Sequence, residues 1–272
     1  MKLIKEIPGI RDVPLTFVID RFDESTAQNL FKIVIEKAKE VRGIVTEAYK
    51  EEWKNDPSTN IRIVFVHWLA KAVRHFSAAI TLCEKNDLSV INDVHHRQIF
   101  ELFIQIRYFA SLNQEEKDKC SKKIYAIGCI DLLEKLSIKK DHPNINGTFK
   151  KISDIVSSLD QDLINEIKSR RKKNTYNWFG KTFSQLAKDV SREGEDLRTI
   201  YQTISADVHG TWDIVLNVRS SSEHIDFRGY PDMKTLYLRS AENLYQITNQ
   251  YMELWNEIAK SVGAQEVYYI SE

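Results

Sequence analysis

The chain has 272 residues, of which 42% are hydrophobic and 29% are charged. This is the composition of a globular protein, and it excludes a chain that is mostly disordered. Lys plus Arg and Asp plus Glu number 39 each, so no net charge draws the whole molecule to a polyanion. Only nine Gly and five Pro occur, too few turn residues for a sandwich or barrel of many short strands. We therefore expect an all-α fold.

The first half of the chain contains four segments in which apolar residues recur at helical spacing. An extended arm comes before them, and Asp23 and Ser25 are candidate N-caps for the first helix. The third segment is apolar nearly all round, which predicts a place in the middle of a bundle. The predicted helices run from Thr26 to Trp53, Thr59 to Glu84, Ser89 to Leu112 and Gln114 to Leu136.

The second half begins with DHPNING, residues 141–147, which breaks the helical pattern. A small hairpin is expected around HIDF, residues 224–227. Helices are predicted from Thr148 to Lys168, Phe183 to Ser191, Glu195 to His209 and Met233 to Val262. The elements together predict an antiparallel helical bundle of long helices, with an inserted helical segment and a long C-terminal helix.

The domain organisation follows from these breaks. Residues 1–22 form the N-terminal arm, 23–140 the first part of the bundle, 141–180 an insertion or seam, and 181–272 the second part, which forms one domain with 23–140. No apolar stretch of signal-peptide length precedes Pro8. The most apolar windows, Ile61 to Ala70 and Ile99 to Leu112, are too short or too interrupted by charge to span a bilayer. We expect a cytoplasmic protein with no membrane partner.

The sequence lacks the motifs of several common metal and catalytic sites. Cys83, Cys120 and Cys129 form an odd set without a Cys-x-x-Cys pair, so we interpret them as reduced and structural. His95 and His96 are adjacent and point apart on a helix, without metal-ligand spacing around them. The sequence has no glycine-rich phosphate loop and no Gly-x-Ser-x-Gly elbow. We therefore expect neither a metal nor a cofactor.

Two helices carry a polar stripe. Residues at i, i+4 and i+8 share one face of a helix. Because an unpaired buried charge is costly, the charged residues of a stripe should pair with each other and meet polar groups of another helix. On the third predicted helix the stripe is Arg97, Glu101 and Gln105, and on the helix ending at His209 it is Tyr201, Ser205 and His209.

If these stripes face each other, Glu101 can orient His209, the Ser205 hydroxyl can bond either neighbour, and Arg97 can hold an anion beside the imidazole. We accordingly take Arg97, Glu101, Tyr201, Ser205 and His209 as candidate catalytic residues. A buried polar network that only fixes helix register would use the same residue types, so that structural interpretation stays open.

Three pieces of the sequence resemble a mostly bacterial helical family catalogued as domain of unknown function 5677. They are HHRQIFELFIQIRYF with its Arg-x-x-x-Glu, NWFGKTFSQLAKD, and IYQTISADVHG with its Tyr-x-x-x-Ser-x-x-x-His-Gly. The resemblance covers roughly residues 90–215. The family name carries no assigned activity.

Members of that family are in turn similar to the helical ribonucleases and toxins called HEPN, which often act in antiviral defence and commonly dimerise around an Arg-x4–6-His motif. The chain departs from this pattern. Literal matches occur from Arg62 to His67 and from Arg219 to His224, but the first has apolar Ile63 where the motif usually has a polar residue, and the second lies in an expected loop. Any cleavage would have to use Arg97 and His209.

A second candidate surface follows the fifth predicted helix, where a basic run is followed by aromatic residues. Cations that contact phosphate and rings that stack on bases are typical of single-stranded nucleic-acid binding. A solvated helix end whose cations complement the helix dipole has the same appearance. The candidate nucleic-acid residues are Arg170, Arg171, Lys172, Lys173 and Trp178.

Two functions remain open. The first is a HEPN-like, metal-independent ribonuclease or toxin component of a bacterial antiviral defence system, a homodimer that acts on RNA with a protein partner from the same operon. The second is a non-catalytic all-α adaptor or sensor that binds a partner protein or a small anionic ligand. A solvent-open groove lined by Arg97 and His209 would favour the first, and a closed, fully paired cluster the second.

Overall fold

The computed structural model describes residues 2–5, 23–53, 60–85, 91–138, 143–172, 179–208, 218–220, 225–227 and 233–270. Within these ranges the chain is a helical bundle, and the expected all-α class is confirmed. The long helices are α1 (Glu24–Trp53), α2 (Asn60–Glu84), α3 (Ile91–Ser111), α4 (Gln114–Ser137) and α10 (Met233–Val262). The shorter helices are α5 (Pro143–Ser157), α6 (Gln161–Lys172), α7 (Phe183–Val190) and α8 (Leu197–Val208).

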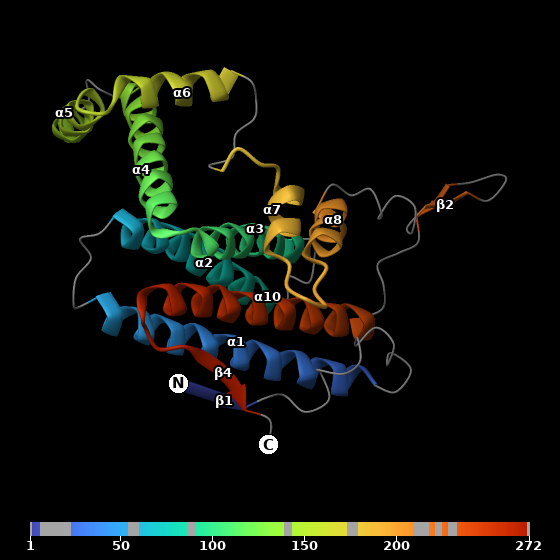
Figure 1. Cartoon of the computed structure of the whole chain (residues 1–272). Helices are drawn as coiled ribbons and strands as arrows, with labels where there is room; N and C mark the ends of the chain where they lie inside the picture. The colour runs from blue at the N-terminus through green and yellow to red at the C-terminus, as the bar shows by residue number, and fades with distance from the viewer. Residues whose placement is uncertain are drawn as a thin grey trace.

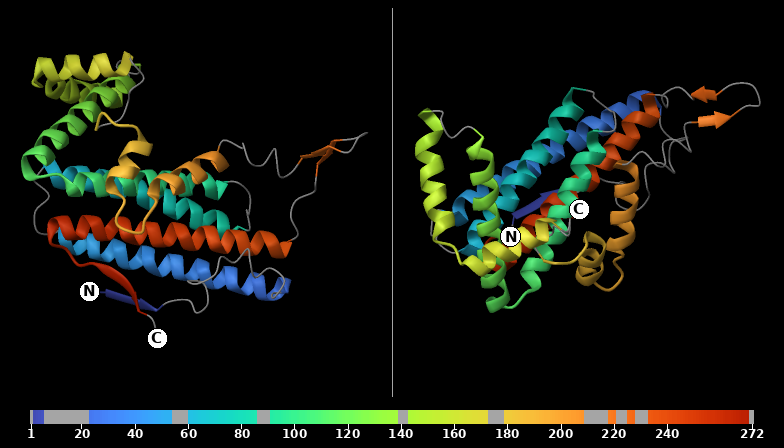
Figure 2. Two further views of the ribbon diagram at one scale, coloured as in Figure 1. Left: turned by 45° about the vertical axis from the view of Figure 1, so that its right-hand side comes forward. Right: turned by 90° about the horizontal axis from the view of Figure 1, so that it is seen from above.

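The body of the bundle has two layers of helices (Figures 1 and 2). The first and last long helices, α1 and α10, run side by side in one layer, and α2 and α3 form the other layer above them. Helices α7 and α8 pack against each other and against the outer side of α3. α3 therefore lies between α2, α10 and the α7–α8 pair, which fits its apolar sequence.

The core consists mainly of large apolar side chains from these helices. Trp68, Trp255 and Tyr251 are among the largest side chains that are fully buried, and Tyr251 stacks on Phe76 with ring centroids 4.4 Å apart. The apolar spacing of α1, α3 and α10 places their side chains toward this common interior. Burying a large aromatic side chain stabilises the fold by about 2 to 3 kcal/mol relative to leaving it exposed.

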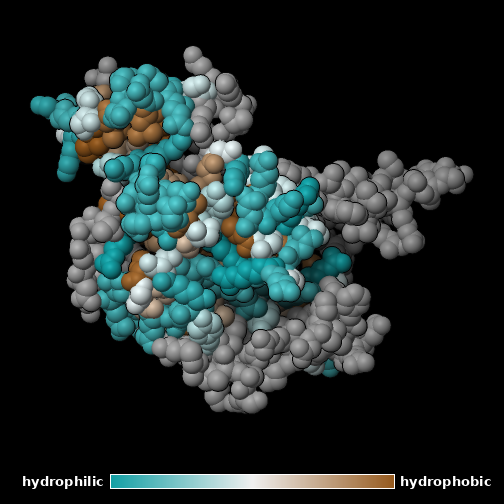
Figure 3. All heavy atoms as spheres, in the orientation of Figure 1, coloured by the Kyte–Doolittle hydropathy of each residue, from teal (hydrophilic) through white to brown (hydrophobic). Residues whose placement is uncertain are grey.

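Helix α4 leads away from the body and carries α5 and α6 at its far end (Figure 1). A small separate cluster of buried residues joins this part: Ala126, Ile127 and Ile130 of α4 with Ile164 and Ile167 of α6. Hydrophobic residues also show at the surface of this region in the space-filling view (Figure 3). Segment 143–172 thus packs on α4 through a core of its own.

The segment predicted as one helix from Thr148 to Lys168 is two helices, α5 and α6. This prediction was wrong because Asp160 caps a second helix: its Oδ1 accepts hydrogen bonds from the backbone N–H groups of Asp162 and Leu163, at 2.7 and 3.2 Å. The start was wrong too, since α5 begins at Pro143 and includes most of the expected DHPNING break. Proline suits the first helical position because its missing N–H is not needed there.

Other predicted elements are confirmed closely. Asp23 caps α1 through the backbone N–H of Thr26, at 2.7 Å, and Asn113 and Glu116 form a capping box at the start of α4. The hairpin around HIDF is present as β2 (Val218–Ser220) and β3 (Ile225–Phe227), which pair antiparallel. The three cysteines are free and buried, as expected.

A parallel pair of strands, which the sequence pattern did not predict, joins the two ends of the chain. Strand β1 (Lys2–Lys5) pairs with β4 (Val267–Ile270), so both lie beside the α1–α10 layer (Figure 1). The chain reaches β4 through Gly263, whose φ of 75° allows the turn that ends α10. There the backbone N–H of Ala264 donates to the carbonyl of Ala259, at 2.8 Å.

Asn256 of α10 fastens β4 to the bundle. Its side-chain amide donates to the carbonyl of Val267 at 2.7 Å, and its Oδ1 accepts from the Val267 backbone N–H at 2.8 Å. Trp255 adds a hydrogen bond from its indole N–H to the carbonyl of Gln265, at 2.9 Å. Two buried backbone groups of β4 thus depend on one side chain.

One segment of the described chain, Ile61–Glu84 in α2, is long and apolar enough to cross a membrane by length and composition alone. The sequence pattern indicated only a shorter apolar window at this place, from Ile61 to Ala70. Core helices of water-soluble proteins meet the same test, and α2 packs against α1, α3, α4 and α10. The cytoplasmic location therefore stays a prediction.

Asn256→Ala should lower the free energy of unfolding by about 2 to 4 kcal/mol, because it leaves both backbone groups of Val267 buried without a partner. Urea denaturation followed by far-UV circular dichroism measures the change. Asn165→Ala is the matched control, since Asn165 bonds only at the surface of α6. Equal midpoints for the two variants would contradict the role given to Asn256.

Candidate functional site

Arg97 of the first predicted polar stripe meets Tyr201 of the second where α3 packs on α8. Arg97 donates from Nε to Oε1 of Glu101 at 2.9 Å, within α3, which confirms that these two residues pair. The Tyr201 hydroxyl of α8 hydrogen-bonds to the same guanidinium. Phe183 of α7 stacks on the Tyr201 ring, with centroids 5.8 Å apart, and so holds the ring against α3.

The electrostatics of this cluster favour a permanently charged Arg97. Burial alone would lower the pKa of its guanidinium, but the interactions with Glu101 and Tyr201 outweigh burial and raise the pKa. The side chains of Arg97 and Glu101 are 21% and 14% exposed, so they are partly desolvated and still reachable from solvent. A ligand could contact Arg97 only by sharing it with Glu101 or by displacing that carboxylate.

Helices α3 and α8 run in opposite directions. Arg107, later in α3, bonds to Glu195, which precedes α8, whereas Arg97, earlier in α3, meets Tyr201 inside α8. Ser205 lies one helical turn beyond Tyr201 and is half-buried. The last member of the predicted stripe, His209, lies outside the described residues. The structure therefore brings three of the five candidates into contact and places the fourth on the same helix.

The predicted nucleic-acid residues are only partly described. The last turn of α6 contains Arg170, Arg171 and Lys172, so the helix ends in a run of basic residues. Lys173 and Trp178 lie outside the described residues.

A second ionic cluster, which the sequence pattern did not predict, is centred on Arg107. This residue is 5% exposed and donates from both terminal nitrogens to the two carboxylate oxygens of Glu195, at 2.8 and 3.2 Å. Its Nε lies 3.5 Å from a carboxylate oxygen of Glu257 on α10, and its guanidinium covers the Phe103 ring at 5.3 Å. One buried cation thus links α3, α10 and the segment between α7 and α8.

Further charges surround this cluster. Arg192 donates to Glu257, and its backbone N–H donates to Glu195 at 2.9 Å. Burial would raise the pKa of Glu195, but these hydrogen bonds and Arg107 prevail and lower it. At Glu253, by contrast, desolvation and the neighbouring carboxylates raise the pKa despite Arg107. The only sign of this cluster in the sequence was an arginine within the apolar run QIFELFIQIRYF.

A polar recess of about 620 Å³ opens beside the Arg107 cluster. Its charged lining is mixed, with four cationic and two acidic side chains: Arg107, Lys117, Arg192, Lys260, Asp189 and Glu257. The arginines are already engaged with Glu195 and Glu257. This recess can bind a polar molecule, although its two arginines are already paired with carboxylates.

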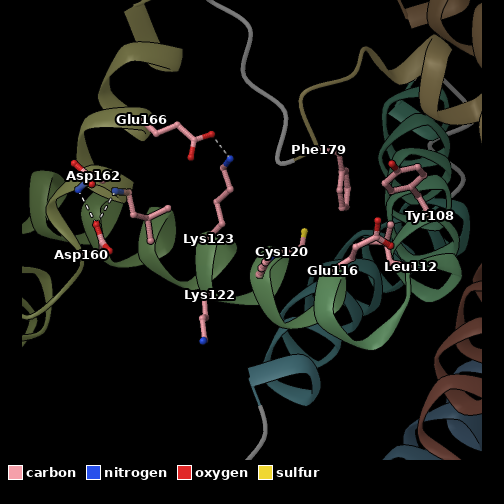
Figure 4. Close-up of a pocket in the computed structure, with 12 residues that line it drawn as sticks. Tyr108, Leu112, Glu116, Cys120, Lys122, Lys123, Asp160, Asp162, Glu166 and Phe179 are labelled. Carbon is pink, nitrogen blue, oxygen red and sulfur yellow. Dashed lines mark hydrogen bonds and ion pairs between the residues drawn. The ribbon is translucent and has the colours of Figure 1, made fainter.

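A second recess of about 620 Å³ lies between α4, α6 and Phe179 (Figure 4). Phe179 makes an edge contact with Tyr108, with centroids 4.8 Å apart, and Lys123 bonds to Glu166 across the opening. Its charged lining comprises three lysines and four carboxylates: Lys119, Lys122, Lys123, Glu116, Asp160, Asp162 and Glu166. This balance gives no excess of positive charge for a phosphate chain.

The Arg62 to His67 match to the HEPN motif lies on α2. Arg62 bonds to Glu52 at the end of α1, 3.2 Å away. His67 is exposed, but partial desolvation and the charges of Lys71 and Arg74 lower its pKa. Neither residue adjoins the Arg97 cluster in the contacts of the described residues. The other match ends at His224, outside the described residues.

Two histidines of α3 occupy different surroundings. His95 approaches His75 of α2, with 3.1 Å between their Nδ1 atoms. His96 is buried, and its Nε2 has no hydrogen-bond partner among the described residues. Burial lowers the pKa of its imidazole, and a hydrogen bond with Gln250 of α10 opposes this only in part. Within these residues no group of three or more metal-ligating side chains is found.

Arg107→Met should lower the free energy of unfolding by about 3 to 5 kcal/mol, because it leaves the carboxylates of Glu195 and Glu257 without their shared buried cation. Urea denaturation measures the loss. Lys119→Met removes an exposed ion pair with Glu115 and should leave the midpoint unchanged. A normal midpoint for Arg107→Met would refute the central role of this cluster.

Acid should destabilise the fold through His96. Burial lowers the pKa of this imidazole from 6.5 to about 4, so on acidification the unfolded chain takes up the proton before the folded chain does. The contribution to stability is complete above pH 6.5 and is lost as the pH falls toward 4, by about 3 kcal/mol in total.

Urea denaturation between pH 7 and pH 4 measures this loss. His96→Leu, which cannot take up a proton, should show a flatter pH dependence than the unmodified protein. His67→Leu, at an exposed position of α2, is the control and should change the slope less. Identical slopes for the unmodified protein and His96→Leu would count against a buried neutral imidazole.

Comparison with known proteins identifies the family. No curated protein and no solved structure matches the chain. A family model described as "Family of unknown function (DUF5677)" matches residues 62–225, more than half of the chain. This range runs from α2 to β3 and includes all three sequence pieces that suggested the resemblance, with the contact between Arg97 and Tyr201. The chain belongs to the DUF5677 family.

Proposed function

We propose that the protein is a metal-independent ribonuclease of the HEPN-like type, with Arg97 and His209 as its reactive pair. The observation that carries the proposal is the contact between the Arg97 guanidinium of α3 and Tyr201 of α8. Tyr201 belongs to the helix whose sequence stripe continues through Ser205 to His209. The contact supports the facing arrangement of the two stripes that such chemistry needs.

In this proposal the imidazole of His209 takes the proton from a ribose 2'-hydroxyl, and the 2'-oxygen attacks the adjacent phosphorus. The P–O5' bond then breaks, the 5'-oxygen leaves with a proton from solvent, and a 2',3'-cyclic phosphate remains on the other fragment. The guanidinium of Arg97 stabilises the negative charge that develops on the phosphorane. Glu101 holds the guanidinium in place through its 2.9 Å bond, and Tyr201 bonds to the same group from α8. Ser205 comes between Tyr201 and His209 in the sequence and can donate to a phosphate oxygen.

The biological setting of the proposal is a toxin component of a bacterial antiviral defence system, located in the cytoplasm. A homodimer would present two such clusters to RNA, and a protein from the same operon would restrain or trigger them. The basic end of α6, with Arg170, Arg171 and Lys172, is proposed to contact the RNA backbone, together with Lys173 and Trp178.

One observation favours the alternative, a non-catalytic adaptor or sensor. Arg97 already has Glu101 and Tyr201 as partners, and none of these three residues lines the recess at Arg107 or the recess at Phe179. A cluster whose charges are satisfied internally suits a register-fixing role. The adaptor would then use its surface to bind a partner protein or a small anionic ligand.

His209→Ala should abolish cleavage of RNA by the purified protein in EDTA, because the general base is lost. Arg97→Ala should lower the rate by roughly a hundredfold or more, because the phosphorane loses its cation. Cleavage of a fluorescent single-stranded RNA, resolved on a denaturing gel, measures both. Expression of each variant in bacteria, with growth and total RNA compared, gives the cellular readout.

Arg198→Ala and His67→Ala are the matched controls, since these residues occupy exposed positions of α8 and α2. Both should cleave at the rate of the unmodified protein. Cleavage that survives in His209→Ala would reject the assignment of the base, and the absence of any cleavage by the unmodified protein would favour the adaptor.

A further inference from the structure

Five basic side chains from three helices gather on one surface of the bundle, where α2 packs against both α3 and α4 (Figure 1). On α2, Arg74 and His75 follow Lys71 by three and four residues, so the three share one helix face. His95 of α3 approaches this face, since its Nδ1 lies 3.1 Å from the Nδ1 of His75. Lys135 of α4 is near enough to influence the pKa of Lys71. We call these five residues the α2 basic cluster.

The part of α2 that carries the cluster has no acidic residue, because residues 61–83 contain no Asp or Glu. Burial lowers the pKa of Lys71, and the charges of Arg74 and Lys135 lower it further. Burial and neighbouring members of the cluster likewise lower the pKa of His75. Among the described residues no carboxylate contributes to either pKa, so each of these groups has other cations as its charged neighbours.

The cluster differs in this respect from other charged surface of the described chain. Lys37 bonds to Glu40 and Lys181 bonds to Asp189, both at 2.7 Å. The exposed Arg74 instead donates from Nε to a backbone carbonyl of α2, at 3.2 Å. Because the whole chain carries no net charge, positive charge that is not neutralised locally gives this one face a field that attracts anions.

The same charges decide between a metal ion and an anion at the two histidines. Two imidazole nitrogens 3.1 Å apart are suited to a shared metal ion, but Lys71 and Arg74 repel such an ion, and the described residues hold no group of three metal-ligating side chains. An anion is attracted by the same two cations and accepts hydrogen bonds from them. Desolvation lowers the pKa of His67, one turn before Lys71, so this residue adds little charge at neutral pH.

We propose that the α2 basic cluster binds the phosphate backbone of single-stranded RNA. This inference rests on the proposed action on RNA and gives it a binding surface apart from the reactive pair. The cluster is open and spreads over three helices, which suits an extended polyanion better than a single enclosed phosphate.

The position of the cluster relative to Arg97 fits this role. His95 and Arg97 are two residues apart near the start of α3, and they reach toward α2 and α8 respectively. A helix with its side chains is about 10 to 12 Å wide. A few nucleotides of extended RNA are long enough to contact the cluster on one side of α3 and Arg97 on the other.

The test uses a fluorescein-labelled 2'-O-methyl oligouridine, which cannot be cleaved because its 2'-oxygen is blocked. Fluorescence anisotropy measures its binding to the full-length protein. Contacts from Lys71, Arg74 and Lys135 predict that the logarithm of the binding constant falls with the logarithm of the salt concentration with a slope of about −2. The double variant Lys71→Ala, Arg74→Ala should weaken binding roughly tenfold and make the slope shallower by about 1.4.

The matched control is the double variant Lys32→Ala, Lys50→Ala, which removes the same charge from exposed positions of α1. It should bind the oligonucleotide as the unmodified protein does, and near-UV circular dichroism checks that both double variants keep their tertiary packing. No binding by the unmodified protein, or equal affinities for the two double variants, would overturn the proposal. Binding to phosphatidylserine vesicles without binding to the oligonucleotide would overturn it in favour of a membrane surface.

A second measurement separates this surface from the proposed chemistry. On a cleavable RNA, the cluster variant should raise KM roughly tenfold and leave kcat unchanged, because binding is lost and the reactive pair is retained. Cluster-dependent binding by a protein that cleaves no RNA would refute the ribonuclease activity and support the RNA surface. Cleavage with an unchanged KM in the cluster variant would refute the surface alone.

Discussion

The burial of α3 on nearly all sides constrains the rest of the molecule. Any charge on such a helix must find a partner, because an isolated buried charge costs several kcal/mol. Arg97 meets this requirement with Glu101 and Tyr201, and Arg107 meets it with Glu195 and Glu257. His96 meets it by remaining neutral. The partners of the two arginines fix where α8 and α10 lie against α3, so the placement of the candidate site follows from the same electrostatic requirement.

The long helices could be predicted from the sequence because they depend on local signals. Apolar spacing gave α1, α2, α3, α4 and α10 to within about two residues at each end, and Asp23 marked the start of the first. The break between α5 and α6 depends on Asp160, which caps α6. It was missed because an aspartate can also lie in the interior of a helix. The pairing of β1 with β4 was missed because it joins opposite ends of the chain, and no local pattern encodes such a partner.

The candidate site could be predicted only in part. Spacing on one helix showed that Arg97 could reach Glu101, and the composition of α8 suggested a polar face for it to meet. The Arg107 cluster could not be found in this way, since Glu195 and Glu257 lie in other elements and look like ordinary surface acids in the sequence.

The packing of α1 against α10 has a consequence for how the chain folds during its synthesis. The apolar face of α1 leaves the ribosome well before α10, the helix that covers it, is made. Until then, among the helices described, that face packs mainly on α2, and exposed apolar surface of this kind promotes aggregation. The contacts that close the bundle are therefore among the most distant in sequence, which slows folding relative to a bundle built from neighbouring hairpins. Nascent chains of this protein should be good clients for a chaperone that shields apolar helices.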